Sequence, residues 1–215
     1  MDAWTHSAEQ IAISQTIQGR RVLGITSPTR ESSVSTLARM IAEAMGRSRF
    51  RALLVLLNVG ENSVPTVRDP SEPWHAVTRD ADDSIDILTA NVTPETRHIF
   101  NNSEWLQAFF AEKLRTYSNL VLDLPAIVDE ESNRLNPLVP ASVCDSVILV
   151  CATGAVTRAE LDQSLKLLKS AEANVIGLVV NEEGYVSRAE EFGLTKARIS
   201  KFMTHYKKSG RRQAP

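Results

Sequence analysis

The chain has few cysteines and no long apolar run. Only two of its 215 residues are cysteines, Cys144 and Cys151, and they flank or lie in the apolar stretch at 147–150. Isolated cysteines of this kind behave as small buried hydrophobes, so we expect no disulfide and a cytosolic location. No run approaches the roughly 18 apolar residues of a membrane-spanning helix. The start, MDAWTHSAEQ, lacks the basic and apolar regions of a signal peptide.

Histidine and excess charge are also scarce. The four histidines have no paired spacing, which argues against a histidine-ligated metal: His6, His75, His98 and His205. Twenty-four basic and 26 acidic residues give a net charge of −2, which excludes a bulk electrostatic nucleic-acid binder of the histone kind. A hydrophobic content of 43% and a charged content of 23% are typical of a folded globular chain.

Apolar, β-branched runs alternate with helical patterns along most of the chain. Strands are predicted at 21–26, 52–57, 85–88, 120–124, 147–150 and 175–180. Helices are predicted at about 34–46, from a Ser103 cap through Leu114, and from a Thr157–Glu160 capping box onward with Leu161, Leu165 and Leu168 on one stripe. Strands that are apolar throughout, alternating with helices, indicate an α/β fold with a mainly parallel, doubly wound sheet.

Two segments differ from this pattern in composition. Residues 62–86 contain three prolines and, after position 68, six acidic residues, which favours a surface loop or short helix. The last 15 residues contain five basic residues and no acidic one, a local charge of +5. They are either a solvated terminus or a contact for anionic lipid or an acidic partner, with Lys207, Lys208, Arg211 and Arg212 as the candidate contacts. We therefore divide the chain into an α/β domain at 1–183, with an N-terminal helical arm at 1–20, and a helical, basic tail at 184–215.

Five segments, in their order and spacing, carry a resemblance to a known family. They are TSPTRESSVSTLA, RALLVLLNV, IDILTANVTPE with NNSEWLQAFFAEKL, YSNLVLDLPAI, and the run from CDSVILV to GLVVN. Over roughly residues 8–182 the chain resembles the bacterial tyrosine kinase (BY-kinase) family, the ATPase partners of polysaccharide co-polymerases. More distantly it resembles the MinD/ParA group of deviant-Walker ATPases. The resemblance implies a P-loop NTPase-like fold with a nucleotide site after the first strand.

The loop after the first strand departs from the family pattern of glycines followed by a lysine. Glu31 and Ser33 stand at the glycine positions, and Val34 stands at the lysine position. Glycines let backbone N–H groups surround phosphates and the lysine neutralises their charge, so this loop has lost both contributions. Ser35 and Thr36 remain and, by resemblance, the first hydroxyl would ligate Mg²⁺; at a helix start they are also ordinary capping residues.

The remaining site positions are mostly replaced as well. Leu56 stands where the family has a catalytic aspartate, and it is followed by Leu57 and Asn58. A leucine cannot accept a proton. Asp123 matches the family's second-motif aspartate, as a candidate Mg²⁺ ligand or a structural carboxylate, and Asn181 matches an adenine-facing asparagine. The resemblance thus implies a degenerate nucleotide-binding region without a catalytic residue: Ser32, Ser33, Ser35, Thr36, Asn58, Asp123 and Asn181.

These replacements predict a member of the family that is not an enzyme and has no cofactor, with ATP and Mg²⁺ only if the degenerate site still binds. By resemblance, it would dock a membrane polysaccharide co-polymerase, a Wzz-like chain-length protein, at the inner membrane and assist exopolysaccharide, capsule or holdfast-like adhesin export. The family's oligomerisation helix has a glutamate and two spaced arginines, whereas here Glu9 is present without those arginines. The family also has a cluster of tyrosines near its C-terminus, whereas here only Tyr206 lies near the end. Assembly into a homo-oligomer is left as an open alternative, and no nucleic-acid partner is expected. The alternatives are an active ATPase or tyrosine autokinase, and a MinD/ParA-like positioning or cellulose-synthesis accessory protein.

Overall fold

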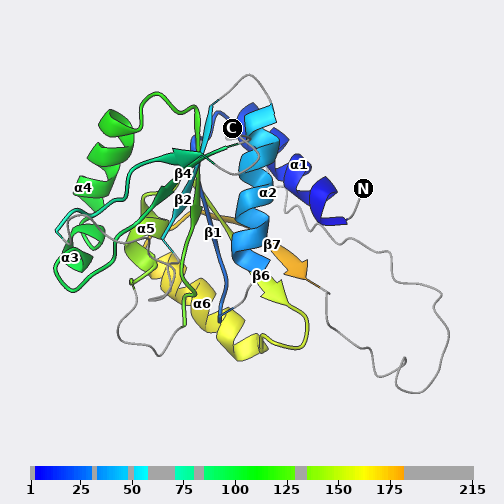
Figure 1. Cartoon of the computed structure of the whole chain (residues 1–215). Coiled ribbons are helices and arrows are strands. Elements are labelled where there is room, and N and C mark those ends of the chain that lie inside the picture. Colours follow the sequence, from blue (N-terminus) through cyan, green and yellow to red (C-terminus); the bar gives the residue numbers. More distant parts are fainter. Residues whose placement is uncertain are drawn as a thin grey trace, which may run out of the picture. The chain divides into compact units, whose positions relative to one another are not determined.

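A computed structural model describes residues 3–30, 33–47, 51–57, 71–79, 85–128 and 135–181 (Figure 1). All of these belong to one compact unit that extends from Met1 to Glu183. The predicted tail at 184–215, with its basic residues, lies outside the described residues. None of the helices in the described ranges has the length and apolar character that crossing a membrane requires.

A seven-stranded sheet forms the centre of this unit, in the order β3-β4-β2-β5-β1-β6-β7. All neighbouring strands are parallel except β3 and β4, which are antiparallel. The strands are β1 (Val22–Thr26), β2 (Ala52–Leu56), β3 (Thr78–Arg79), β4 (Asp86–Thr89), β5 (Asn119–Asp123), β6 (Ser146–Ala152) and β7 (Val175–Asn181). The predicted α/β class with a mainly parallel, doubly wound sheet is confirmed.

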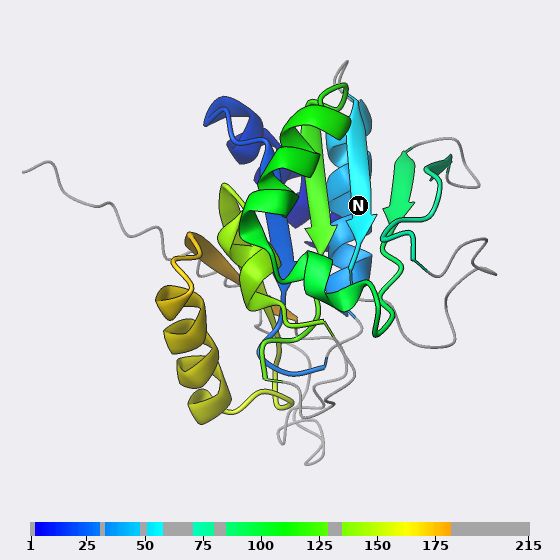
Figure 2. The ribbon, with the colours of Figure 1, turned by 90° about the vertical axis from the view of Figure 1, so that its left-hand side faces the viewer.

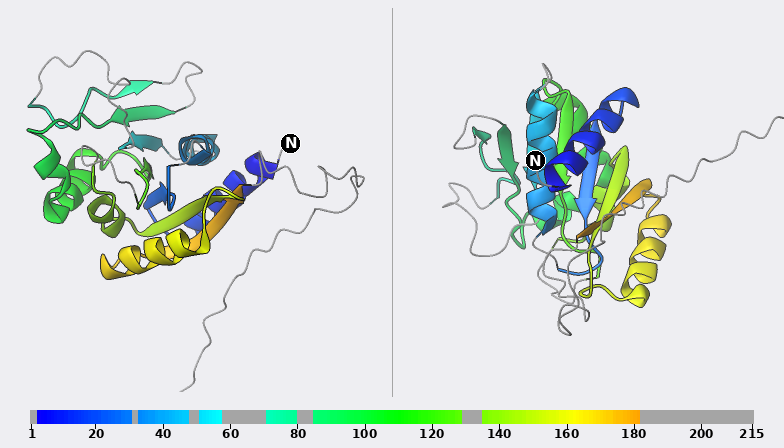
Figure 3. Two further views of the ribbon diagram at one scale, coloured as in Figure 1. Left: turned by 90° about the horizontal axis from the view of Figure 1, so that it is seen from below. Right: turned by 90° about the vertical axis from the view of Figure 1, so that its right-hand side faces the viewer.

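Helices cover both faces of the sheet. On one face lie α1 (Ala3–Ile17) and α2 (Ser33–Arg47), seen in dark and light blue in Figure 3. On the other face, in front of the sheet in Figure 2, lie α3 (Arg97–Phe100), α4 (Ser103–Ala108), the π-helix η1 (Phe109–Lys113), α5 (Leu138–Ser142) and α6 (Arg158–Ser170). Parallel strands need crossover connections, and each crossover returns the chain to the amino end of the sheet. The helices in these connections therefore cover the faces of the sheet.

Each helical layer packs on its own apolar core. Beneath α1 and α2, the side chains of Ile25, Leu54 and Ile148 are at most 3% exposed. On the opposite face, alternate residues of the same strands, such as Leu53 and Leu122, pack against α3 to α6 and η1. The inner strands can be apolar at every position because both of their faces are covered.

Local capping signals from the sequence are partly confirmed. The Thr157–Glu160 capping box is present, with the Thr157 backbone N–H donating to Glu160 at 2.7 Å and the Glu160 N–H donating to the Thr157 hydroxyl at 3.3 Å. The predicted cap at Ser103 is wrong by one residue. Asn102 caps α4, and its side chain accepts a hydrogen bond from the Trp105 N–H at 2.9 Å. The stripe on α6 is only partly buried: Leu168 is fully buried, whereas Leu165 is 38% exposed.

The acidic segment at 62–86 differs from the expectation of a loop or short helix. Its residues 62–70 and 80–84 lie outside the described residues. In its described part, β3 pairs with β4, and Trp74 forms an isolated antiparallel bridge with Ala90. The His75 N–H donates to the Thr89 carbonyl at 2.9 Å. Residues 74–79 therefore extend the sheet beyond β4 through backbone pairing.

Candidate functional site

The predicted site residues lie at or near the carboxyl ends of parallel strands. Ile25 and Leu56 both pair with Asp123, so the ends of β1, β2 and β5 lie at one level in the sheet. The chain leaves β1 through a short loop and enters α2 at Ser33. Ligands of open α/β sheets bind in this place, outside the carboxyl ends of the strands.

Backbone hydrogen bonds fasten the loop after β1 to the loop after β5. The Ile127 N–H donates to the Ser27 carbonyl at 2.9 Å, and the Val128 N–H donates to the Pro28 carbonyl at 2.8 Å. The Thr26 hydroxyl donates to the Pro125 carbonyl at 2.6 Å. These contacts continue the β1–β5 pairing beyond the strands and fix the start of the predicted phosphate loop against the Asp123 segment.

The first turn of α2 places its side chains in two different environments. Val34 is 1% exposed and packs in the core that α2 shares with the sheet, and Ser33 is 8% exposed. Ser35 and Thr36, by contrast, are exposed. The position that the resemblance aligns with a phosphate-binding lysine thus contributes apolar packing to the core.

Asp123 is one of the residues that carry the resemblance, and it lies on β5, an inner strand of the sheet. Its side chain is 2% exposed at the end of β5, and its carbonyl accepts from the Leu57 N–H at 3.0 Å. A structural carboxylate at this place could accept a hydrogen bond from the hydroxyl of Ser35 or Thr36. Among the described contacts neither hydroxyl donates to Asp123, and both residues are exposed.

Asn181 lies apart from the other candidates. It ends β7, is 6% exposed, and its carbonyl accepts from the Thr153 N–H at 2.8 Å. Because β6 separates β7 from β1, Asn181 lies two strands away from the loop that leads into α2. Glu31, Ser32 and Asn58 lie outside the described residues.

The described residues do not fit a magnesium-bound nucleotide. Asp123 is the only carboxylate in the described parts of the three strand ends, and Val34 supplies no charge. In the described part of the chain, no group of three or more histidine, cysteine, aspartate or glutamate residues is arranged to hold a metal. Mg²⁺ needs several oxygen ligands, and phosphates need a cation to neutralise them. The described residues at the strand ends supply one carboxylate and no lysine.

Glu9 has a partner within its own chain. Its carboxylate lies 3.4 Å from Arg47 at the end of α2, and the two side chains are 34% and 63% exposed. Exposed pairs of this kind contribute little to stability. The interaction joins α1 to α2 within one copy of the chain.

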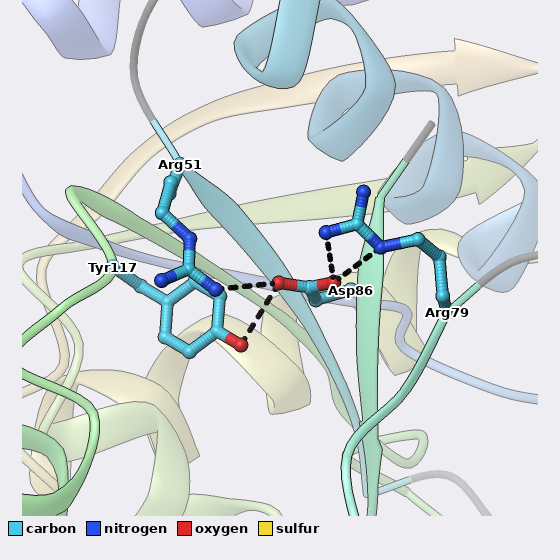
Figure 4. A network of polar contacts seen from close by, with 4 residues as sticks. All are labelled: Arg51, Arg79, Asp86 and Tyr117. Carbon is cyan, nitrogen blue, oxygen red and sulfur yellow. Dashed lines mark hydrogen bonds and ion pairs between the residues drawn. The ribbon is translucent and has the colours of Figure 1, made fainter. Parts of the chain in front are cut away.

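A buried carboxylate at the opposite end of the sheet was missed by the sequence analysis. Asp86 opens β4, and its Oδ2 accepts from Arg51 at 3.0 Å and from the Tyr117 hydroxyl at 2.9 Å, while Oδ1 accepts from Arg79 at 2.9 Å (Figure 4). The Arg51 guanidinium also lies over the Tyr117 ring, 4.7 Å from its centroid. The Asp86 carboxylate therefore joins three chain segments.

These neighbours determine the protonation of the cluster. Burial by itself would raise the pKa of Asp86, but the Tyr117 hydroxyl and the two arginines outweigh it, so the pKa of Asp86 lies below its ordinary value. Burial and the Asp86 carboxylate together raise the pKa of Tyr117. The network is thus held in its charged, hydrogen-bonded form at neutral pH.

Comparison with known proteins supports the fold. No family model matches the chain, and no curated protein matches it. The kinase domain of the Escherichia coli tyrosine kinase ETK superposes with a TM-score of 0.65 at 18% identity, covering 89% of this chain and 76% of that one. The VpsO kinase domain superposes with a TM-score of 0.60 at 18% identity, covering 82% and 95%. The MinD cell division protein of Aquifex aeolicus gives 0.56 at 19%, covering 82% and 75%. The chain therefore has the P-loop NTPase-like fold of these proteins.

Proposed function

We propose, from a fold shared with bacterial tyrosine kinase domains, that this chain is a non-catalytic relative of those kinases. It would assist polymerisation and export of an exopolysaccharide, a capsule or a holdfast-like adhesin. It would do so by docking a membrane co-polymerase of the Wzz-like chain-length type at the cytoplasmic face of the inner membrane. The observation that carries the proposal is the burial of Val34 in the apolar core, at 1% exposure.

The first step concerns phosphate binding. In the resemblance, position 34 supplies the charge that neutralises phosphate oxygens, and here an apolar side chain fills that position and packs inward. Electrostatic stabilisation of the transferring phosphoryl group accounts for most of the catalysis in this class of reaction. Without the lysine, phosphoryl transfer would lose several orders of magnitude in rate.

The second step concerns the catalytic base. The base position of the resemblance is Leu56, the last residue of β2, which lies beside Asp123 in the sheet. A hydrocarbon side chain can neither accept a proton from the attacking hydroxyl nor bind a metal ion. Asp123 alone would have to supply both functions, which supports a role in binding partners over a role in catalysis.

The third step concerns the partner. ETK and VpsO, whose kinase domains share the fold, are the basis for the exopolysaccharide pathway in this proposal. The +5 charge of residues 201–215 supplies a candidate contact for an acidic surface, through Lys207, Lys208, Arg211 and Arg212. These residues lie outside the described part of the chain, so their role rests on sequence alone.

Isothermal titration with Mg-ATP tests the catalytic part of the proposal. We expect no binding at nucleotide concentrations up to about 1 mM. Micromolar binding that is weakened by Asp123→Asn, but not by the exposed control Asp162→Asn, would favour the alternative of an active ATPase or autokinase. Phosphotyrosine at Tyr206 after incubation with ATP would decide for the autokinase.

Purification from membranes tests the docking part. The full chain should co-purify with a polysaccharide co-polymerase, and changing Lys207, Lys208, Arg211 and Arg212 together to glutamate should reduce the yield of that partner. Co-purification that is unaffected would remove the tail from the docking surface. Salt-sensitive binding to DNA would instead favour a MinD/ParA-like positioning protein.

A further inference from the structure

Most of the exposed large apolar side chains of the described residues belong to the edge strand β7 and to the two helices α1 and α6, which lie on opposite faces of the sheet. Seven large hydrophobic residues are substantially exposed, and six of them belong to α1, α6 and β7. These are Ile13 (52%), Ile17 (79%), Leu165 (38%), Ile176 (37%), Leu178 (45%) and Val180 (54%). Figure 3 shows β7, in orange, at the outer edge of the sheet, with α6 in yellow on one face and α1 in dark blue on the other. Exposed apolar side chains on the edge strand and on the helices that flank it favour an interaction at this edge.

The two edges of the sheet are protected very differently. The edge strand β3 has only two residues, both exposed, and one of them is the charged Arg79. At the other edge, β7 has seven residues, VIGLVVN, with no ionisable side chain. Short or charged edges resist pairing with another chain, whereas long, uncharged, apolar edges favour it. Within the described ranges, no strand lies beyond β7.

The backbone of β7 also offers hydrogen-bonding groups at this edge. The Asn181 carbonyl faces β6, because it accepts from the Thr153 N–H at 2.8 Å. Since successive residues of a strand direct their polar groups to opposite sides, Leu178 and Val180 direct theirs outward. The same two residues thus carry both the exposed apolar side chains and the outward-facing backbone groups.

From this arrangement we infer that β7 pairs in an antiparallel manner with β7 of a second copy of the chain, about a twofold axis at Val179. This register sets Leu178 opposite Val180 of the partner subunit, and Gly177 opposite Asn181 of the partner subunit. A hypothetical Cβ on Gly177 would meet no heavy atom within 4 Å, so the face of the sheet above this residue is open. Antiparallel pairing about a twofold is self-complementary, and two uncharged strands bring no like charges together.

The size of the surface points to a weak dimer. The three exposed side chains of β7 offer about 250 Å² of apolar surface per copy, hence about 500 Å² in a pair, which is at the low end for interfaces between proteins. Backbone hydrogen bonds between the two β7 strands would add to this apolar contribution. The result would be a continuous sheet through both copies, with β6 and β7 between the new contact and the candidate nucleotide region at β1.

Sedimentation velocity of the full chain, with a matched pair of variants, tests this inference. The wild-type chain should be dimeric at tens of micromolar. Leu178→Lys should weaken the dimer by roughly 100-fold, because it sets two lysines close to the axis in a desolvated interface. Val77→Lys is the control, because Val77 has the same exposure of 45% and lies next to β3, at the opposite edge of the sheet. It should leave the dimer unchanged.

Cysteine cross-linking tests the register. Val179→Cys should form a disulfide-linked dimer under a mild oxidant, because the axis brings the two positions together as a directly opposed pair. Gly177→Cys should not, since the register separates the two copies of this residue by about 13 Å. A monomeric wild-type chain, or a dimer that survives Leu178→Lys, would overturn the inference. Cross-linking at position 177 and not at 179 would overturn the register. Capture of a different protein on this edge by a monomeric chain would replace the second copy as occupant.

Discussion

The two ends of the sheet use charged residues differently. At the amino end, Asp86 is buried between two arginines and a tyrosine, and three chain segments meet at its carboxylate. At the carboxyl end, the positions that the resemblance assigns to charged groups are Val34 and Leu56. Here Asp123 is the buried carboxylate, and its described surroundings supply no comparable pair of arginines.

This contrast indicates what the fold retains. In nucleotide-binding members of such folds, charge is concentrated at the carboxyl end, because phosphates and metal ions must be neutralised there. In this chain the buried charged network of the described residues lies at the end that binds no ligand in open α/β folds. The charged groups of the Asp86 network therefore stabilise the fold, whereas Val34, at the start of α2, contributes apolar packing.

Val34→Lys should have the largest effect on stability. A lysine at this 1% exposed position would have to bury an unpaired ammonium group among apolar side chains, which should lower the free energy of unfolding by about 3 kcal/mol. Chemical denaturation measures the loss. Ser35→Lys, one residue along at an exposed position, should change stability by less than about 0.5 kcal/mol. A stable Val34→Lys variant that binds Mg-ATP would show that the carboxyl end remains a working phosphate site.

Asp86→Asn should have an intermediate effect. The change removes the charge that holds Arg51, Arg79 and Tyr117 together, but both arginine side chains are more than half exposed and would be solvated by water. We expect a loss of about 2 kcal/mol in urea denaturation. The control is Asp162→Asn, because Asp162 pairs with Arg158 on the surface of α6 with side chains 56% and 94% exposed. It should be nearly neutral. Equal losses in the two variants would contradict a structural role for the amino end.

The smallest effect should be the acid dependence of stability. Because the folded pKa of Asp86 lies below its ordinary value, the contribution of Asp86 to stability is present above that ordinary value and is lost as pH falls through the folded pKa. Denaturation of the wild-type chain should therefore show a steeper loss of stability below about pH 4 than denaturation of Asp86→Asn. Parallel pH profiles of the two proteins would assign the acid sensitivity to other carboxylates.

The strands and helices were largely predictable because their signals are local. The apolar runs at 52–57 and 120–124 correspond to β2 and β5, and the capping box at Thr157 starts α6. The Asp86 network was not predictable, since its partners Arg51 and Tyr117 lie 35 and 31 residues away in the sequence. Only the pairing of β2, β4 and β5 brings these segments together.

For the candidate site, the sequence supplied identities and the fold supplied environments. The sequence identifies Val34 at the position that the resemblance assigns to a lysine, but the burial of Val34 depends on how α2 lies on the sheet. A hydrogen bond between Asp123 and Ser35 or Thr36 depends on where these side chains point, and no local sequence pattern specifies that direction. In the structure these hydroxyl residues face solvent, because the helix turns Val34 and Leu37 toward the core.

The sequence by itself indicated a strand at 175–180, because a short, apolar run rich in β-branched residues favours a strand over a helix. It did not determine where that strand lies. An interior strand and an edge strand can have the same composition, and only the order β1-β6-β7 places this one at the border, with Leu178 and Val180 exposed. Local side-chain preferences fix secondary structure, whereas exposure depends on which neighbours the tertiary fold supplies.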